Sequence, residues 1–111
     1  GGVLLLPADL PLISSADIDN LLRRDAPVVI APDRHGMGTN ALMVRLDAFG
    51  DPFVFQFGEG SYAKHHDEAA RLGVDALTAI SLGTSFDLDT PEDLHELDSM
   101  RITSGRGVAA R

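Results

Sequence analysis

The sequence contains no cysteine, and its basic side chains are scarce: 9 Lys and Arg stand against 17 Asp and Glu, for a formal net charge of −8. Without cysteine there is no disulfide bond, zinc–thiolate site or thiol nucleophile. A surface that binds the backbone of nucleic acids needs clustered cations, so the charge balance argues against a nucleic-acid partner. A small phosphorylated ligand is compatible with it, because a local cation or a bound metal can invert the field of one pocket.

Long hydrophobic runs are absent as well. No apolar run approaches the ~20 residues of a membrane helix, and no cationic-then-apolar signal peptide opens the sequence. We therefore expect a cytosolic protein without a membrane partner. With 111 residues and a hydrophobic fraction of 44%, the chain has the size and composition of one small globular domain.

The first residues are unusual. Gly1-Gly2-Val3 has no initiator Met and runs at once into an apolar segment, residues 3–6, of the kind found in a strand buried on both faces. We expect this chain to be the C-terminal part of a longer protein. In this interpretation residues 1–100 belong to one domain and residues 101–111 form a flexible tail.

Apolar runs alternate with helical patterns along the chain. Strands are predicted at residues 3–6, 28–30, 41–44 and 76–80. Helices are predicted after Ser14, with Asp17 completing a capping box, from Gly60 or Ser61 to Leu72 with Gly73 beyond the end, and from Thr90 onwards. Residues 47–52 are expected to be a surface loop and residues 85–89 an extended segment. This order predicts an α/β layered domain with a largely parallel sheet.

Polar side chains gather in the loop between the second and third apolar runs, APDRHGMGTN at residues 31–40. Its glycines, which include Gly38, permit positive φ and close approach of the backbone to a ligand. Arg34 adds a guanidinium, while Thr39 and Asn40 add a hydroxyl and an amide with no apolar reason to be there. We interpret the loop as an anion site built from backbone N–H groups and the guanidinium. The alternative is an ordinary polar turn.

Three acidic residues stand apart from those at helix starts and polar faces. Asp9 follows an apolar strand and caps no obvious helix. Asp87 and Asp89 lie two residues apart in an extended segment, so their side chains project to the same side. Two negative charges at such a short distance are unfavourable unless a cation lies between them. Mg²⁺, which prefers carboxylate oxygens and substrate phosphates, would satisfy this need. The alternative is that Asp89 caps the following helix and Asp87 faces water.

Two adjacent histidines, His65 and His66, fall within the second predicted helix. Neighbouring residues on a helix point about 100° apart, so at most one of them can face a given ligand. We expect both on a surface face, without a shared metal.

Four segments together resemble a known family: LLPADLP at residues 5–11, APDRHGMGTNAL at 31–42, FGEGSYAKH at 57–65 and FDLDTPEDL at 86–94. In this order they are similar to the guanylyltransferases that make the phospholactyl or enolpyruvyl guanosine diphosphate precursor of coenzyme F(420). The resemblance implies a Rossmann-related, MobA-like nucleotidyltransferase fold, of which this chain would be the C-terminal half. It also implies an enzyme that joins GTP to 2-phospholactate, phosphoenolpyruvate or 3-phosphoglycerate and releases pyrophosphate.

The same resemblance assigns roles to individual residues. Asp9, Asp87 and Asp89 fall on the metal-binding acids of the family and are the candidate catalytic and Mg²⁺-binding residues. The acceptor-phosphate pocket of the family falls on Thr39, Gly58 and Ser61, beside Gly38 and Arg34 of the glycine loop. In such a reaction an acceptor phosphate oxygen attacks the α-phosphorus of GTP, so positioning and charge neutralisation carry the catalysis.

One part of the family pattern has no match in this sequence: the loop with glycine and Lys or Arg that cradles the nucleotide triphosphate. We therefore expect the 111 residues alone to be inactive, and an exposed sheet edge to pair with another copy or chain. Two alternatives stay open, a MobA-like transferase with another nucleotide or acceptor, and a non-catalytic half-domain that binds ligands or forms oligomers.

Overall fold

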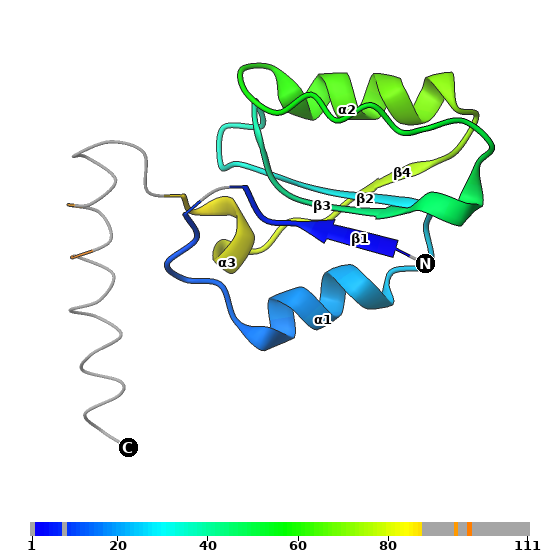
Figure 1. Cartoon of the computed structure of the whole chain (residues 1–111). Coiled ribbons are helices and arrows are strands. Elements are labelled where there is room, and N and C mark those ends of the chain that lie inside the picture. The colour runs from blue at the N-terminus through cyan, green and yellow to red at the C-terminus, as the bar shows by residue number, and fades with distance from the viewer. Residues whose placement is uncertain (1, 8, 88–94, 96–97, 99–111) are drawn as a thin grey trace.

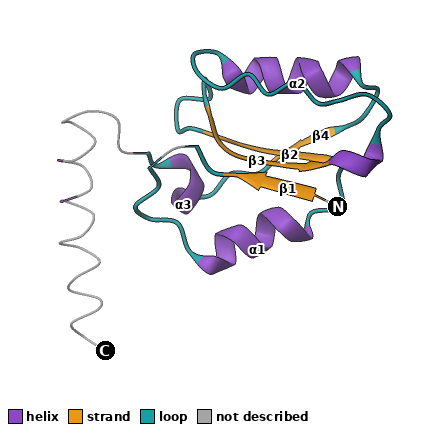
Figure 2. Cartoon of the chain, in the orientation of Figure 1, coloured by secondary structure: helices purple, strands orange, loops and turns teal. Residues whose placement is uncertain are grey.

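The computed structural model describes residues 2–7, 9–87, 95 and 98. Its elements follow the chain in this order: β1 (Gly2–Leu5), α1 (Ser15–Arg23), β2 (Val28–Pro32), β3 (Thr39–Arg45), a 3₁₀ turn (Leu46–Ala48), α2 (Ser61–Arg71), β4 (Ala76–Thr78) and α3 (Leu82–Ser85) (Figures 1 and 2). The expected α/β class is confirmed. The start of the helix expected at Thr90, the acid Asp89 and the expected tail at 101–111 lie outside the described residues.

The four strands form one mixed sheet in the order β1-β3-β2-β4. Strand β3 runs antiparallel to both of its neighbours, and only β2 and β4 pair in parallel. The expectation of a largely parallel sheet is therefore wrong. The cause is the connection between β2 and β3, because residues 33–38 are too few for a crossover helix and close a hairpin instead.

The reversal of β3 leaves β1, β2 and β4 running in one direction. Their carboxyl ends, at Leu5, Pro32 and Thr78, lie at the same edge of the sheet as the first residue of β3, Thr39. In open α/β sheets this is the edge at which ligands bind. The loops that follow the strands can therefore build one site there, even though the sheet is mixed.

Helices α1 and α2 cover opposite faces of the sheet (Figure 1). Alternate residues of β2 divide between these faces: Val29 packs in one core cluster with Leu21 of α1, while Val28 and Ile30 pack in a second with Ala69 of α2. Successive strand residues point to opposite faces, so a strand buried on both sides is apolar at every position. This explains the unbroken apolar run of β2.

The predicted start of α1 and both predicted ends of α2 are confirmed. Ser14 caps α1, since its Oγ accepts the Asp17 N–H at 3.2 Å and the Asp17 carboxylate accepts the Ser14 N–H at 2.9 Å. Helix α2 begins at Ser61, directly after Gly60, which has φ +72°. Gly73 follows its C-terminus, also with φ +72°. Both glycines hold left-handed conformations that residues with a Cβ rarely adopt.

One local expectation is wrong, and one short element was not expected. Ser85 is not extended but ends α3, a single turn whose cap Ser81 accepts the Thr84 N–H at 3.2 Å. A 3₁₀ turn at Leu46–Ala48 overlaps the start of the expected surface loop at 47–52, whose residues are mostly exposed, as expected. Each element is only about one helical turn long, which is too short for hydrophobic periodicity to reveal it.

Strands β1 and β4 form the two edges of the sheet. Pairing of an edge with a second copy of the chain stays a prediction. Within the part of the chain that the structure describes, no helix is long and apolar enough to span a membrane.

Candidate functional site

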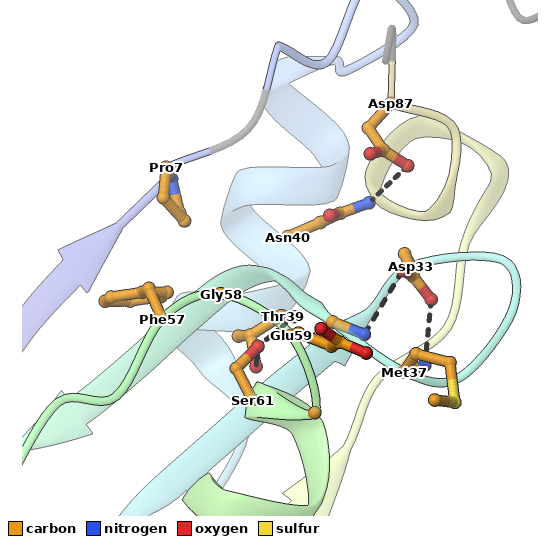
Figure 3. Close-up of a pocket in the computed structure, with 12 residues that line it drawn as sticks. Pro7, Asp33, Met37, Thr39, Asn40, Phe57, Gly58, Glu59, Ser61 and Asp87 are labelled. Atoms are coloured by element: carbon orange, nitrogen blue, oxygen red, sulfur yellow. Dashed lines mark hydrogen bonds between the residues drawn. The ribbon is translucent and has the colours of Figure 1, made fainter. Parts of the chain in front are cut away.

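A cleft of about 540 Å³ opens at the sheet edge where β1 and β2 end and β3 begins (Figure 3). It gathers segments that are distant in the sequence: the end of β1, the hairpin loop, the N-terminal end of α2 and the residues after α3. Its lining residues are Pro7, Asp33, Met37, Gly38, Thr39, Asn40, Phe57, Gly58, Glu59, Gly60, Ser61 and Asp87.

Thr39 and Ser61 hold the two sides of the cleft together. The Thr39 N–H donates to Ser61 Oγ at 2.8 Å, and Ser61 Oγ donates to Thr39 Oγ1 at 3.2 Å. The Ser61 N–H donates to the carbonyl of Gly58 at 3.1 Å. Thr39, Gly58 and Ser61 therefore come together, as the sequence predicted. The expected donation of the Ser61 N–H to a ligand is not supported, since that N–H already has a partner.

His65 lies behind Thr39 and corrects a sequence-based expectation. We expected a surface position, but the side chain is fully buried. Its Nδ1 lies 2.8 Å from Thr39 Oγ1, and its Nε2 accepts the Gln56 N–H at 3.0 Å. Burial lowers the pKa of His65, while the charge of Glu68 opposes this shift. The signal in the sequence was the spacing of Ser61 and His65, four residues apart and hence on one face of α2.

Asp33 organises the hairpin loop. Its Oδ1 accepts the N–H groups of His35 and Met37, both at 3.0 Å, and its Oδ2 accepts the Gly38 N–H at 3.1 Å. The Gly36 N–H donates to the Asp33 carbonyl at 3.1 Å. These N–H groups already serve the loop itself, so the expected anion site built from them is wrong. Asp33 was missed, although an Asp at the start of a glycine turn is a known signal for such a cap.

The other two candidate site residues in this loop, Gly38 and Arg34, differ in their relation to the cleft. Gly38 lines the cleft, and a Cβ at this position would lie 3.1 Å from the Asp33 carboxylate. The Arg34 guanidinium lies 4.9 Å from the centre of the Phe86 ring, and the Arg34 N–H donates to the Ser85 carbonyl. Arg34 is not among the residues that line the cleft, so its role there stays a prediction.

Asn40 joins the cleft to the segment after α3. Its Nδ2 donates to the Thr84 carbonyl at 2.9 Å, to the Ser85 carbonyl at 3.3 Å and to Asp87 Oδ1 at 3.3 Å (Figure 3). The Asn40 side chain is buried, where its donors need such partners. Asn40 thereby holds Asp87 at the cleft. In the sequence, this amide stands out only as a polar group that no apolar pattern accounts for.

The three acids of the expected metal site are described only in part. Asp87 lines the cleft, and Asp9 is exposed two residues after Pro7, another lining residue. Asp89 lies outside the described residues. Among the residues that are described, no three Asp, Glu, His or Cys side chains are grouped to hold a metal ion. The Mg²⁺ site formed by Asp9, Asp87 and Asp89 therefore stays a prediction.

The charge of the cleft sets a condition on what it can bind. Asp33, Glu59 and Asp87 line it, and no Lys or Arg appears among the lining residues that the structure describes. The Asp33 carboxylate is used by the loop, which leaves Glu59 and Asp87 facing a ligand. An anion in this cleft would be repelled unless a cation accompanied it.

Comparisons with known proteins agree on one family. Its sequence model, described as "Guanylyl transferase CofC like", matches residues 2–108. The chain is 43% identical over 102 residues to a phosphoenolpyruvate guanylyltransferase of Rubrobacter xylanophilus, covering 89% of this chain and 48% of the relative. It is 40% identical over 111 residues to a 2-phospho-L-lactate guanylyltransferase of Methanothermobacter thermautotrophicus, covering 98% and 46%.

The relatives are longer than this chain. A phosphoenolpyruvate guanylyltransferase of Sphaerobacter thermophilus, 39% identical over 97 residues, is covered to 45% of its length. The chain thus spans about half the length of the curated relatives it matches.

Proposed function

Because this chain belongs to the family of CofC-like guanylyltransferases, we propose that its protein transfers GMP from GTP to a small phosphorylated three-carbon acid and releases pyrophosphate. The acceptor is 2-phospholactate, phosphoenolpyruvate or 3-phosphoglycerate, each of which carries one phosphate and one carboxylate. The product would be a precursor of coenzyme F(420). The four-stranded mixed sheet would be the C-terminal part of a Rossmann-related, MobA-like domain.

One observation carries the acceptor assignment: the Thr39 and Ser61 hydroxyls meet beside Gly58 in one cleft. These are the residues at which the family resemblance expects the acceptor phosphate. Gly58, with φ +114°, turns the chain into α2. A hydroxyl donor favours a charged phosphate oxygen over a neutral acceptor.

The reaction needs no nucleophile from the protein. A phosphate oxygen of the acceptor attacks the α-phosphorus of GTP, a new P–O bond forms, and the bond to the pyrophosphate leaving group breaks. The chain contributes by fixing the acceptor phosphate at the Thr39 hydroxyl, which Ser61 supports. Holding two reactants in line can account for about 7–11 kcal/mol of a barrier, which is enough for positioning to dominate catalysis.

A divalent cation fits the acidic cleft. Asn40 donates to Oδ1 of Asp87, and within the described part of the chain Oδ2 has no hydrogen bond, so Oδ2 would be the oxygen that Asp87 offers to a cation. Asp87 and Asp9, with Asp89, are the residues that would hold Mg²⁺. When bound, Mg²⁺ would neutralise the phosphate charges. Because the described lining residues include no Lys or Arg, binding of the acceptor should depend on this cation.

The proposed activity can be tested in a chimaeric enzyme. This chain would replace the matched part of the Rubrobacter relative, to which it is 43% identical over 102 residues. Pyrophosphate release from GTP would be measured with each of the three acids and Mg²⁺. The proposal expects turnover with at least one phosphorylated acid and none with pyruvate, which lacks the phosphate.

A matched variant assigns the activity to this chain. Thr39→Val keeps the shape and the backbone N–H but removes the hydroxyl from the cleft. It should raise the acceptor KM while the GTP KM stays within about twofold. A folded chimaera, verified by circular dichroism, that releases no pyrophosphate with any of the acids would contradict the proposal.

A further inference from the structure

His65 is placed to control the acceptor pocket without lining it. Its imidazole is fully buried between two aromatic rings, with centroid distances of 6.0 Å to Phe53 and 4.9 Å to Phe57. Phe57 itself lines the cleft. A polar ring in such surroundings needs a partner for each nitrogen, and His65 has one on each side.

These two partners determine which nitrogen carries the proton. Gln56 offers a backbone N–H to Nε2 at 3.0 Å, and this N–H can only donate. Nε2 must therefore be the unprotonated nitrogen. In the neutral ring the hydrogen then lies on Nδ1, which donates to Thr39 Oγ1 at 2.8 Å. In a protonated imidazole the Nε2–H would face the Gln56 N–H, and neither donor would have an acceptor. Burial, which lowers the pKa of His65, favours the same neutral form.

The tautomer of His65 in turn fixes the hydroxyl of Thr39. A hydroxyl has two acceptor lone pairs and one hydrogen. Thr39 Oγ1 accepts from His65 Nδ1–H at 2.8 Å and from Ser61 Oγ–H at 3.2 Å. Both lone pairs are then in use, so the hydrogen of Thr39 is left to donate elsewhere. Because Thr39 lines the cleft, this hydrogen is available to a ligand there.

We propose that His65 is a positioning residue of the acceptor pocket, which orients the Thr39 hydroxyl as a hydrogen-bond donor to the acceptor phosphate. The proposal rests on the proposed function for the identity of that phosphate. In this arrangement the two hydroxyls have different roles. Thr39 donates to the ligand, while Ser61 donates to Thr39 and accepts from the Thr39 N–H.

Two substitutions of His65 separate the functions of its nitrogens. His65→Asn keeps an N–H donor near the position of Nδ1, whereas His65→Gln keeps an acceptor near the position of Nε2 and loses the donor to Thr39. Calorimetric titration of the 111-residue chain with phosphoenolpyruvate and Mg²⁺ measures the affinity. We expect His65→Gln to weaken binding about three- to tenfold and His65→Asn to stay within about twofold of the original chain.

A double-mutant comparison tests whether His65 acts through Thr39. In a chain that already carries Thr39→Val, the further change His65→Gln should alter the affinity by less than about twofold. An additive effect, equal losses in both His65 variants, or unchanged affinity in His65→Gln would overturn the proposal. If Thr39→Val weakens binding but His65→Gln does not, only this inference fails; if Thr39→Val has no effect, the acceptor assignment fails with it.

The tautomer can be observed without any substitution. Long-range ¹H–¹⁵N spectra of the unaltered chain distinguish the two ring nitrogens of each histidine. His65 should show a protonated Nδ1 and an unprotonated Nε2 at neutral pH. A protonated Nε2 would overturn the proposal even if every variant failed to fold.

Discussion

Asn40 Nδ2 donates to Asp87 Oδ1 at 3.3 Å across a separation of 47 residues. The same nitrogen also reaches the carbonyls of Thr84 and Ser85. One buried amide thus fixes the position of an acid that the family resemblance assigns to metal binding. The contact links the hairpin that supplies Thr39 to the segment that supplies Asp87.

Replacing Asn40 by Leu should destabilise the chain by about 1–3 kcal/mol, because buried carbonyl groups lose their donor while the volume is nearly kept. Urea denaturation at pH 7 measures the change. Asn20→Leu is the control, since Asn20 is exposed on α1 and should shift stability by no more than about 0.5 kcal/mol. Equal effects of the two substitutions would show that the Asn40 contacts contribute nothing.

Removing the Ser61 hydroxyl should weaken acceptor binding. Ser61→Ala leaves the Thr39 N–H without its partner and takes a donor from Thr39 Oγ1. Because Ser61 supports Thr39 and does not itself donate to the ligand, we expect a loss of roughly 0.5–1.5 kcal/mol, or about two- to tenfold in affinity for phosphoenolpyruvate, measured by calorimetry.

The control for Ser61→Ala is Ser14→Ala, which removes the cap of α1 and should lower stability by about 1 kcal/mol. Ser14 is not among the residues that line the cleft, so its removal should leave acceptor affinity unchanged. Should Ser61→Ala bind as tightly as the original chain, the assignment of Ser61 to the acceptor pocket is wrong.

Glu68 should make stability depend on pH in acid. Its carboxylate is bound by Arg71, with Nε at 2.7 Å, and by the Val54 N–H at 2.6 Å. The hydrogen bond from Arg71, then that from Val54, lowers the pKa of Glu68 from 4.5 to about 2. Because the folded pKa is depressed, this stabilisation is present above pH 4.5 and is lost as the pH falls towards 2.

Glu68→Gln should therefore reduce the fall in unfolding free energy between pH 4.5 and pH 2, as followed by urea denaturation at several pH values. Asp19→Asn makes the same charge change in an exposed residue of α1 and serves as the control. If the unfolding free energy of Glu68→Gln falls between pH 4.5 and pH 2 as much as that of the original chain, the contacts of Glu68 do not stabilise the fold.

The elements that could be predicted from sequence are those governed by local rules. The capping box of Ser14 and Asp17 and the left-handed Gly73 each depend on residues within one turn of the chain. The apolar runs of β2 and β3 follow from burial on both faces. Apolar runs do not encode strand direction, so they do not predict the reversal of β3 after the short connection 33–38, which lies inside the ligand loop predicted at residues 31–40.

The candidate site was predictable through its motifs, and its supporting contacts were not. Thr39, Gly58 and Ser61 could be grouped because they match a family pattern. The buried position of His65 depends on the packing of segment 53–57 against α2, in which the Gln56 N–H donates to His65 Nε2. Such a contact between segments leaves no periodic signal. Asp33 was overlooked since its role is to satisfy loop N–H groups that had been assigned to a ligand.

We expect the 111 residues alone to release no pyrophosphate from GTP above background. The sequence has no match to the family loop that cradles the triphosphate, so the α-phosphorus would not be held in line. Loss of such positioning can remove about 7–11 kcal/mol of barrier reduction. The assay uses the purified chain with GTP, phosphoenolpyruvate and Mg²⁺. Turnover of about 1 per second or more would show that this chain supplies the whole catalytic site.

The central claim is that the cleft at Thr39 and Ser61 binds a phosphorylated three-carbon acid together with a divalent cation. Calorimetric titration of the chain with phosphoenolpyruvate, in the presence and absence of Mg²⁺, tests it most directly, with pyruvate and inorganic phosphate as matched controls. We predict saturable binding of phosphoenolpyruvate with a Kd below about 1 mM only when Mg²⁺ is present, and weaker binding of both controls. Absence of phosphoenolpyruvate binding with Mg²⁺, or equal affinity for pyruvate, would contradict the claim.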